Sequence, residues 1–472
     1  MWHSAGQRFL AIRSRIPAFC ASAVVVASVV FAQQPNSSPL TISAAVQTAL
    51  QKYPSIPASE QQVNAAAAGI RLARTNYLPS LNALGQVNRA TRNNVFGLLL
   101  PQAVIPNMSG PVLGTNDGTN VWGSAVGVLV SWEPFDFGRR HALVESAQAT
   151  RNRAELTGKR TQFDIETATA AAFLTLLASE QTVRAAQAAV DRSQVLARSV
   201  TALVNAQLRP GADLSRANTE LDAAQTQLIQ ANQSVDVART AVARYTGLDP
   251  KSIQAVSGQL LQLPPETNVP SAGVEANPAA QEQNSLVQES QARLSVLEHT
   301  YRPTFNLQAG AYARGTGALP DGSTLGGGNG LVPNYFNSGA GFTVSFPAFS
   351  LFSIRAQQAQ EAAVERAASA TYHQVLTDLQ AQLNAAQATL MQAQRIAAVT
   401  PKEVADARTG FNQANAQYRS GLTTIVAVAE AQRLLAQAEI DDSLAKLAVW
   451  RAMLQIQTVQ GDIGGFLSEA SK

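Results

Sequence analysis

Few residues of this 472-residue chain have the types and spacing that catalysis or metal binding requires. Beyond the N-terminal residues the histidines are His141, His299 and His373, which stand far apart, whereas metal ligands cluster at short spacing. The single cysteine is Cys20, and no nucleophile motif such as G-x-S-x-G is present. Acidic residues are scattered along helical stretches, where solvation explains them. The sequence therefore predicts no catalytic residue, no metal, no cofactor and no enzymatic activity.

The most informative polar residues belong to a repeated heptapeptide. Residues 205–211 read NAQLRPG and residues 415–421 read NAQYRSG, with five of seven positions identical. A basic residue and then a glycine between two Ala/Gln-rich stretches is typical of a tight turn between antiparallel helices. Asp213 and Thr423 follow each glycine by two residues and are predicted N-caps of the next helices. The best functional candidates are these turn residues: Arg209, Gly211, Tyr418, Arg419 and Gly421.

Two segments with alternating apolar residues carry an aromatic residue at each end of one face, ten positions apart. The pairs are Trp122 with Trp132 and Phe336 with Phe346. Ten residues at about 3.3 Å each, tilted by about 40°, rise roughly 25 Å, the height of the apolar band on an outer-membrane barrel. A soluble β-sandwich also gives alternation. The chain has four predicted strands in all and resembles an exported protein (below), and together these features favour a face in contact with lipid. These four aromatics are the predicted lipid-interface residues.

The duplication extends over nearly the whole chain. Tyr77-Leu78-Pro79 matches Tyr301-Arg302-Pro303, and Val130-Ser131-Trp132 matches Val344-Ser345-Phe346. We predict a signal peptide at 1–32, a first structural repeat at 33–247, a linker with little regular structure at 248–277, a second repeat at 278–460 and a frayed C-terminal tail at 461–472. Within the repeats we predict strands at about 79–92, 121–132, 304–314 and 336–346, and helical hairpins at 139–247 and 353–460. Thr400-Pro401 predicts a kink or restart within the second hairpin.

The N-terminal residues resemble an export signal. Arg8, Arg13 and Arg15 precede a short apolar stretch that ends in a small-residue cleavage site at Ala32. Without these three arginines the 35 basic residues become 32, equal to the 32 acidic residues, so nucleic-acid binding has no support. No later segment approaches 18 uninterrupted apolar residues. An exported chain of this kind is either soluble or inserted as a β-barrel.

In the order and duplication of these features, the chain resembles the TolC-like family of outer-membrane efflux channels. The resemblance is carried by the stretch LTISAAV at 40–46, by the helix-to-strand junctions at Pro79 and Pro303, and by the paired turns around Gly211 and Gly421. It implies a mainly α fold with a transmembrane β-barrel portion, in which a homotrimer forms a 12-stranded barrel and a long α-helical tunnel. The number of strands by itself indicates an oligomer, because four strands cannot close a barrel in lipid. Two or three copies would close one, and only the larger assembly would leave a pore.

The resemblance also implies a function. The chain would be a passive conduit of a tripartite efflux or export system, located in the cell outer membrane with its helices in the periplasm. Its partners would be outer-membrane lipid, a periplasmic adaptor (membrane fusion) protein and an inner-membrane transporter. Two alternatives are a periplasmic coiled-coil adaptor and a structural envelope protein without a transport role. The sequence does not identify the cargo, the pump class or the resting state of the channel.

Each candidate site has two interpretations. In the resembled family the turn residues face the adaptor and the pore closes there, but a basic residue and a glycine also end helices without any partner. Glu220 and Glu430 lie nine residues past the turn glycines, where the family carries acidic rings at the channel entrance. Ala217 and Ala427 leave any such ring sparse, and a solvated glutamate is the other interpretation.

Overall fold

The computed structural model describes residues 39–91, 119–264, 273–319, 323–346 and 349–471. These residues belong to one compact unit, Ser38–Lys472. The predicted signal peptide at 1–32 lies outside the described residues, as do residues 92–118 between the first two predicted strands. Within the described ranges, we find no helix that combines the length and the apolar content needed to cross a membrane.

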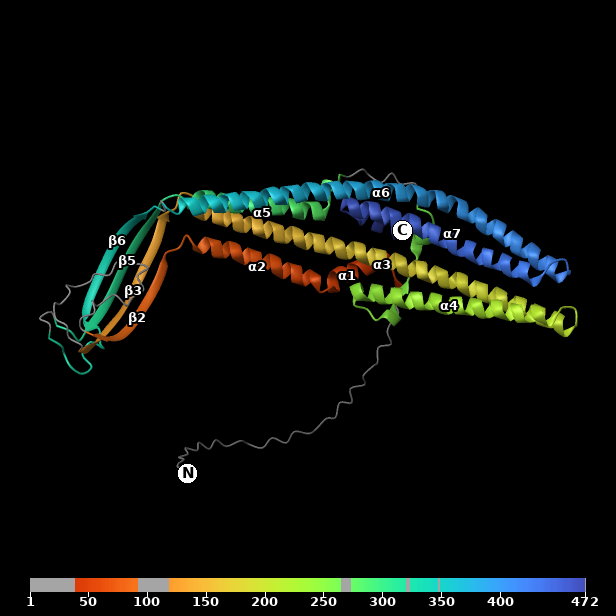
Figure 1. Cartoon of the computed structure of the whole chain (residues 1–472), viewed down its shortest axis with the longest axis horizontal. Coiled ribbons are helices and arrows are strands. Elements are labelled where there is room, and N and C mark those ends of the chain that lie inside the picture. The colour runs from red at the N-terminus through yellow and green to blue at the C-terminus, as the bar shows by residue number, and fades with distance from the viewer. Residues whose placement is uncertain (1–38, 92–118, 265–272, 320–322, 347–348, 472) are drawn as a thin grey trace, which may run out of the picture. The chain divides into compact units, whose positions relative to one another are not determined.

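The chain passes twice through the same order of elements (Figure 1). The first pass consists of α1 (Ile42–Lys52), α2 (Ser55–Thr75), β2 (Ser80–Thr91), β3 (Asn120–Phe135), α3 (Arg139–Asn205) and α4 (Gly211–Thr246). The second pass consists of α5 (Pro278–Thr300), β5 (Thr304–Thr316), β6 (Tyr335–Ser345), α6 (Leu351–Arg419) and α7 (Ile425–Gln460). The prediction of a mainly helical fold with a smaller β portion is confirmed.

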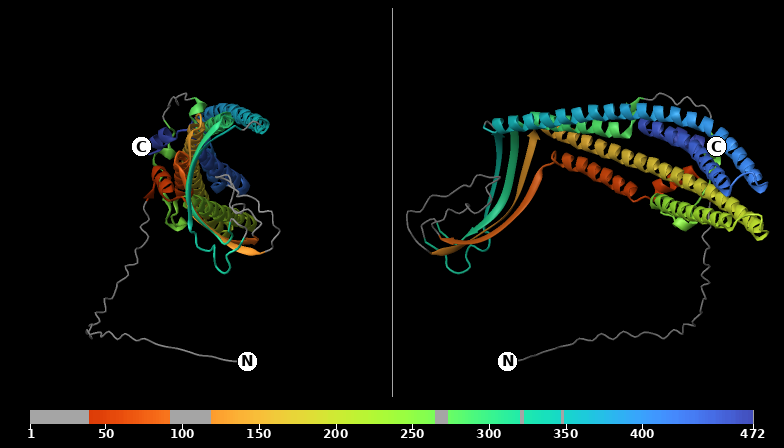
Figure 2. Two further views of the ribbon diagram at one scale, coloured as in Figure 1. Left: turned by 90° about the vertical axis from the view of Figure 1, so that its left-hand side faces the viewer. Right: turned by 45° about the vertical axis from the view of Figure 1, so that its right-hand side comes forward.

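The two long helices, α3 and α6, have 67 and 69 residues, so each extends about 100 Å at 1.5 Å per residue. Helix α3 packs against α2, α4, α5 and α7, and α6 packs against α5 and α7. The buried alanines of α4 recur every seven residues, at 217, 224, 231 and 238. This spacing gives the narrow apolar seam with which long helices pack side by side. The sheet lies at one end of these helices and both hairpin turns lie at the other (Figures 1 and 2).

Pro401 lies inside α6, where the sequence predicts a kink or restart. The structure has a single helix from Leu351 to Arg419, so the predicted restart is wrong. Thr400 does not cap a new helix. It is buried, and its hydroxyl donates to Asp442 of α7 at 3.0 Å. Packing of this side of α6 against α7 therefore preserves the helix, although proline cannot donate a backbone hydrogen bond.

The four strands form one antiparallel sheet in the order β2-β3-β5-β6. Its register pairs Leu81 with Val130, Val130 with Ala309, and Ala309 with Ala340. Because paired residues on neighbouring strands point to the same side, the apolar residues of all four strands share one face. We call it the apolar face. Strands β2 and β6 are the outer strands, and each has one unpaired edge within the described sheet.

The apolar face is exposed. Its exposed large side chains are Leu81, Val87, Val126, Val128, Val130, Trp132, Leu307, Phe336, Phe342 and Val344. The opposite face carries polar residues and glycines, among them Asn82, Gln86, Gln308, Gly310 and Gly341. A contiguous exposed apolar surface of this extent marks contact with lipid or with another protein.

The C-terminal residues do not form the frayed tail that the sequence predicts, and this prediction is wrong. Residues Gly464–Ala470 form a short helix, α8. The Asp462 carboxylate accepts a hydrogen bond from the Gly464 amide at 2.8 Å at the start of this helix. Phe466 is fully buried, and its ring lies 6.0 Å from that of Trp450 in α7. Burial of this aromatic pair fixes the end of the chain in the core.

The segment at 248–277, predicted as a linker, also packs into the core where it is described. It contains the two-residue strand β4 (Gln254–Ala255), which pairs in parallel with β1 (Pro39–Leu40). It also contains the 3-10 helices η1 (Pro250–Ser252), η2 (Gly258–Leu261) and η3 (Val274–Ala276). Ile253 and Leu260 are buried in the main hydrophobic core. The segment has little regular structure, as predicted, but it is anchored by these apolar side chains.

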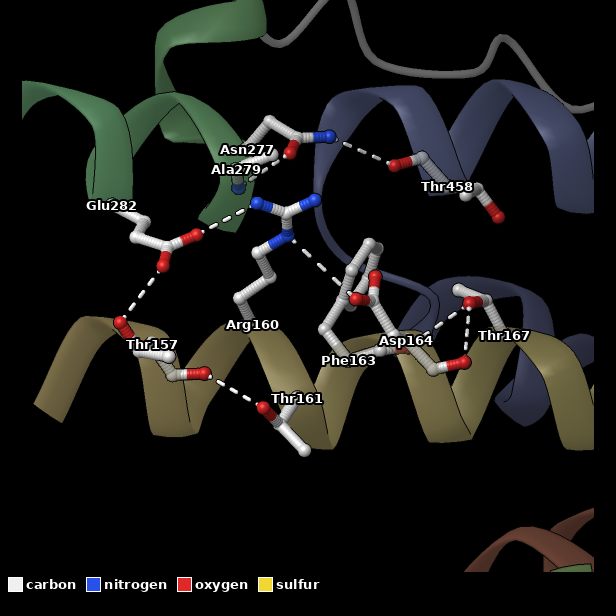
Figure 3. Close-up of polar contacts among 10 residues, drawn as sticks. All are labelled: Thr157, Arg160, Thr161, Phe163, Asp164, Thr167, Asn277, Ala279, Glu282 and Thr458. Atoms are coloured by element: carbon white, nitrogen blue, oxygen red, sulfur yellow. Dashed lines mark hydrogen bonds and ion pairs between the residues drawn. The ribbon is translucent and has the colours of Figure 1, made fainter. Parts of the chain in front are cut away.

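Polar contacts hold α3 against α5 (Figure 3). Arg160 pairs with the Glu282 carboxylate at 2.7 Å, and the Thr157 hydroxyl donates to the same carboxylate at 2.8 Å. Burial alone would raise the pKa of Glu282, but the hydrogen bonds from Arg160 and Thr157 lower it overall. Two turns further along α5, the buried carboxylate of Glu289 pairs with Arg153 at 3.0 Å. These contacts join α3 of the first repeat to α5 of the second repeat.

Candidate functional site: the two hairpin turns

The two turns end their first helices in the same way but with different residues. After α6, the Leu422 amide donates to the Gln417 carbonyl at 2.8 Å, and Gly421 adopts a left-handed φ of +82°. This is the Schellman arrangement that the sequence predicts for Gly421. After α3, the corresponding left-handed residue is Gln207, with φ of +60°, and the Leu208 amide donates to the Leu203 carbonyl at 2.9 Å.

Gly211 therefore does not end a helix, and this part of the turn prediction is wrong. It is the first residue of α4, and Pro210 occupies the N-cap position in an extended conformation. The physical reason is Pro210, because the residue before a proline avoids the helical region and α3 must end earlier. The predicted N-caps are also wrong, since Thr424 rather than Thr423 precedes α7 and Asp213 lies in the first turn of α4.

The two turns meet in what we call the tip cluster, formed by Arg209, Asp213 and Tyr418. The Tyr418 hydroxyl donates to Asp213 Oδ2 at 3.0 Å. The Arg209 guanidinium lies over the Tyr418 ring, 4.5 Å from its centroid, and donates to the Tyr418 carbonyl oxygen. Tyr418 is only 1% exposed. A cation–π contact and a charge-assisted hydrogen bond therefore join the turn of the second hairpin to the turn of the first.

An apolar layer supports the tip cluster. It contains Leu196 and Val200 of α3, Ala217 of α4, and Ile425 and Val428 of α7. Both hairpins contribute side chains to this layer, so both turns pack against the same cluster of buried residues.

The other predicted turn residues lie at the surface. Arg419 and Gly211 are exposed, and a Cβ placed on Gly421 would lie 3.8 Å from the Arg209 guanidinium. Two residues that the sequence analysis missed stand at the apexes: Leu208 and Leu422, 69% and 78% exposed. A leucine directly after the left-handed residue of each turn is the signal that could have identified them.

The predicted entrance acids converge on one arginine. Arg433 of α7 lies 2.8 Å from the Glu430 carboxylate and 4.0 Å from the Glu220 carboxylate of α4. The group of three therefore carries a net charge of −1 rather than −2. The sequence analysis missed Arg433, although its three-residue spacing from Glu430 is a recognised helical pairing. Whether these acids act at a channel entrance stays a prediction.

The predicted interface aromatics lie at both ends of the sheet. Trp132 and Phe346 lie at the end near the helices, and the Trp132 indole N–H donates to the Tyr77 carbonyl at 3.2 Å. Phe336 lies towards the opposite end on the apolar face and is 74% exposed. Trp122, half-buried, lies at that same end with the Arg89 guanidinium 5.3 Å from its ring.

Tyr418 offers a direct test of the tip cluster. Burial, which has the larger effect, and the hydrogen bond to the Asp213 carboxylate raise the pKa of Tyr418 to about 12. Since an unfolded tyrosine has a pKa of about 10, the protonated Tyr418 stabilises the fold fully below pH 10 and this contribution is lost as pH rises through 12. A tyrosinate absorbance titration should show one late-ionising group that is absent from Tyr418→Phe and ionises earlier in Asp213→Asn. Identical titrations of the wild type and Tyr418→Phe at high pH would contradict the arrangement.

Solved structures with the same fold come from several outer-membrane channels. The Campylobacter jejuni CmeC channel matches with a TM-score of 0.72 at 15% identity, covering 91% of this chain and 89% of that one. The Vibrio cholerae protein VceC matches with a TM-score of 0.70 at 16% identity, covering 89% and 96%. The Neisseria gonorrhoeae MtrE channel, solved in its open state, matches with a TM-score of 0.67 at 15% identity, covering 89% and 88%. At these identities the similarity establishes the fold alone.

A comparison with curated proteins finds no match. The sequence itself matches the model of the family described as "Outer membrane efflux protein" over residues 45–248 and 269–462, which include both repeats. The two matched blocks correspond to the two passes of helix, strand, strand and hairpin. They include the tip cluster and the sheet. The chain therefore belongs to the outer membrane efflux protein family.

Proposed function

We propose that this protein is the passive outer-membrane channel of a tripartite efflux or export system. The observation that carries the proposal is one four-stranded sheet with an exposed apolar face, continued by two long hairpins whose turns lie together at the far end. An apolar face ending in aromatics suits the lipid of the outer membrane. Helices about 100 Å long suit a passage through the periplasm towards an adaptor and an inner-membrane transporter.

The channel is a homotrimer in this proposal. Its support is the pair of unpaired edges on β2 and β6, which lipid cannot satisfy with hydrogen bonds. Three copies joined edge to edge give 12 strands, enough to leave a pore. Apolar side chains stand exposed on the two outer helices of the hairpins as well: Ile229 and Val237 on α4, and Met391, Ile396 and Val399 on α6. These side chains are the surfaces with which neighbouring copies would pack.

The turns are proposed to dock the adaptor. Their support is position and shape, because the tip cluster holds both turns in one place and presents Leu208 and Leu422 to solvent. The alternative of a periplasmic coiled-coil adaptor fits less well, because such a protein needs one hairpin and no membrane-facing sheet. A structural envelope protein would not conduct ions, so a conductance measurement distinguishes it from a channel.

Planar-bilayer recording and heat-modifiable migration test the proposal together. The purified protein should migrate as an oligomer until heated and should conduct when inserted into a bilayer. A monomeric protein in the periplasmic fraction that does not conduct would overturn the proposal.

A charged residue on α6 should disrupt assembly. Val399→Lys places an ammonium on the exposed apolar stripe, where burial against a neighbour would leave the charge without a partner. We expect loss of most of the heat-modifiable oligomer. The matched control is Gln394→Lys, an exposed position on a different side of the same helix, which should leave the oligomer intact. Equal oligomer yields from both variants would exclude this stripe from the interface.

A further inference from the structure

One cation stands on the apolar face of the sheet. The residues of β2 on this face are Leu81, Ala83, Gly85, Val87 and Arg89, paired in register with Val130, Val128, Val126, Ser124 and Trp122 of β3. Arg89 is the charged residue among them. It lies at the end of the sheet that is remote from the helices.

The contact of the Arg89 side chain with the described residues is made through an aromatic ring. Its guanidinium lies 5.3 Å from the centroid of the Trp122 ring, and the side chain is exposed. Among the residues that the structure describes, none pairs a carboxylate with Arg89. At the other end of the sheet, Arg139 and Arg140 pair with Glu133 and Asp136 at 3.3 and 3.0 Å. Contact with an aromatic ring leaves the N–H groups of a guanidinium free to bind an anion such as a carboxylate or a phosphate.

The backbone of Trp122 is held in place by the loop that follows β5. Its carbonyl oxygen accepts a hydrogen bond from the Gly317 amide at 2.9 Å, just beyond β5. Gly330 also packs against this carbonyl, with a left-handed φ of +95° and no room for a Cβ. The loop after β5 therefore fixes the backbone of the strand at Trp122.

The depth of Arg89 and Trp122 in the proposed membrane determines which anions they can bind. An arginine on a lipid-facing strand costs about 2–4 kcal/mol at the bilayer midplane but only about 0–1 kcal/mol near the interface. At that depth the available anions are lipid phosphates, with which arginine forms short charge-assisted hydrogen bonds. A cation that stands beside a tryptophan, and that no carboxylate of the described residues pairs with, fits this environment at the end of an apolar face.

We propose that Arg89 and Trp122 form a binding site for the phosphate group of a membrane lipid. The site lies in the leaflet that meets the end of the sheet remote from the helices. The guanidinium binds the phosphate, and the indole packs on the first carbons of the lipid. This inference rests on the proposed placement of the apolar face in a membrane.

Lipid retention by the intact oligomer tests the site. The full-length protein is reconstituted in phosphatidylcholine nanodiscs with or without phosphatidic acid, and the phosphatidic acid retained after release is counted by native mass spectrometry. We expect Arg89→Gln to weaken retention about tenfold, the size expected for one lost charge-assisted hydrogen bond. The control is Arg314→Gln, at the same end of the sheet on the opposite face, which should stay within about twofold of the wild type.

The outcomes separate the possible sources of error. Equal retention by Arg89→Gln and the wild type would overturn the site, as would an equal loss in Arg314→Gln. Displacement of the lipid by millimolar inorganic phosphate would show a site for free phosphate and would overturn the assignment to lipid. Conductance is recorded on the same samples. A wild type that does not conduct would refute the channel function, whereas a conducting Arg89→Gln oligomer with unchanged retention would refute only the lipid site.

Discussion

Replacement of Gly421 by valine is expected to abolish export while the oligomer still reaches the membrane. Gly421 has a φ of +82°, and a β-branched residue in this conformation costs about 1–2 kcal/mol. That loss is small beside the packing of α6 along its whole length. A Cβ at this position would meet only the Arg209 guanidinium, at 3.8 Å, so the added bulk points into the space where an adaptor would dock.

Gly211 supplies the matched control for this experiment. Its φ is not left-handed and no atom lies within 4 Å of a Cβ built on it, so Gly211→Val adds bulk at the neighbouring turn without backbone strain. If docking needs both apexes, Gly211→Val should also reduce export, with unchanged hydrogen exchange at the turn. Export is measured beside heat-modifiable migration and cross-linking to the adaptor. Wild-type export by a stably assembled Gly421→Val oligomer would mean that the turn only joins two helices.

The second large effect is expected from Val128→Arg, which should prevent insertion into the membrane. Val128 lies in the middle of the apolar face, 48% exposed, between Ala83 and Ala311 on the neighbouring strands. A lipid-facing arginine at this depth costs about 2–4 kcal/mol, and the cost is repeated in every copy of the oligomer. The variant should accumulate without a heat-modifiable band in membrane fractions.

Gln308→Arg is the control on the other face of the same sheet. Gln308 is paired with Ser131, which points away from the apolar face, so an arginine there meets the polar side. This variant should insert and assemble like the wild type. Normal insertion of Val128→Arg, or equal failure of both variants, would mean that the apolar face does not contact lipid.

The strands and their faces could be predicted from the sequence because alternation has a period of two and a one-residue error would reverse every side chain. Trp122 and Trp132 are ten positions apart on one face in the sequence, and the register of β3 keeps them there. The helical hairpins could be predicted because long Ala/Gln-rich stretches with only isolated glycines and one proline leave few other choices. The resemblance to the outer-membrane channels is confirmed at the level of the family.

The errors occurred where tertiary packing opposes local preference. Thr400-Pro401 predicts a kink or a restart, and the restart is wrong because α6 continues through Pro401 while it packs against α7. The glycines at 464 and 465 predict fraying, but burial of Phe466 orders α8. The partners at the turns could not be predicted, because Asp213 meets Tyr418 across 205 residues of chain. Local propensity cannot report contacts between repeats. The adaptor-docking role of the turns stays a prediction.

The tip cluster also records how the two repeats have diverged. Leu208 and Tyr418 occupy equivalent positions in the repeated heptapeptide, as do Arg209 and Arg419. Only the second repeat offers an aromatic ring, so Arg209 of the first has a ring to cover, whereas Arg419 is exposed. The halves of the ancestral duplication are therefore no longer interchangeable. Two copies of the first repeat would place Arg209 against a leucine at this contact, with no aromatic ring to cover. The contact therefore joins two unlike hairpins, of which the first supplies the guanidinium and the second supplies the ring.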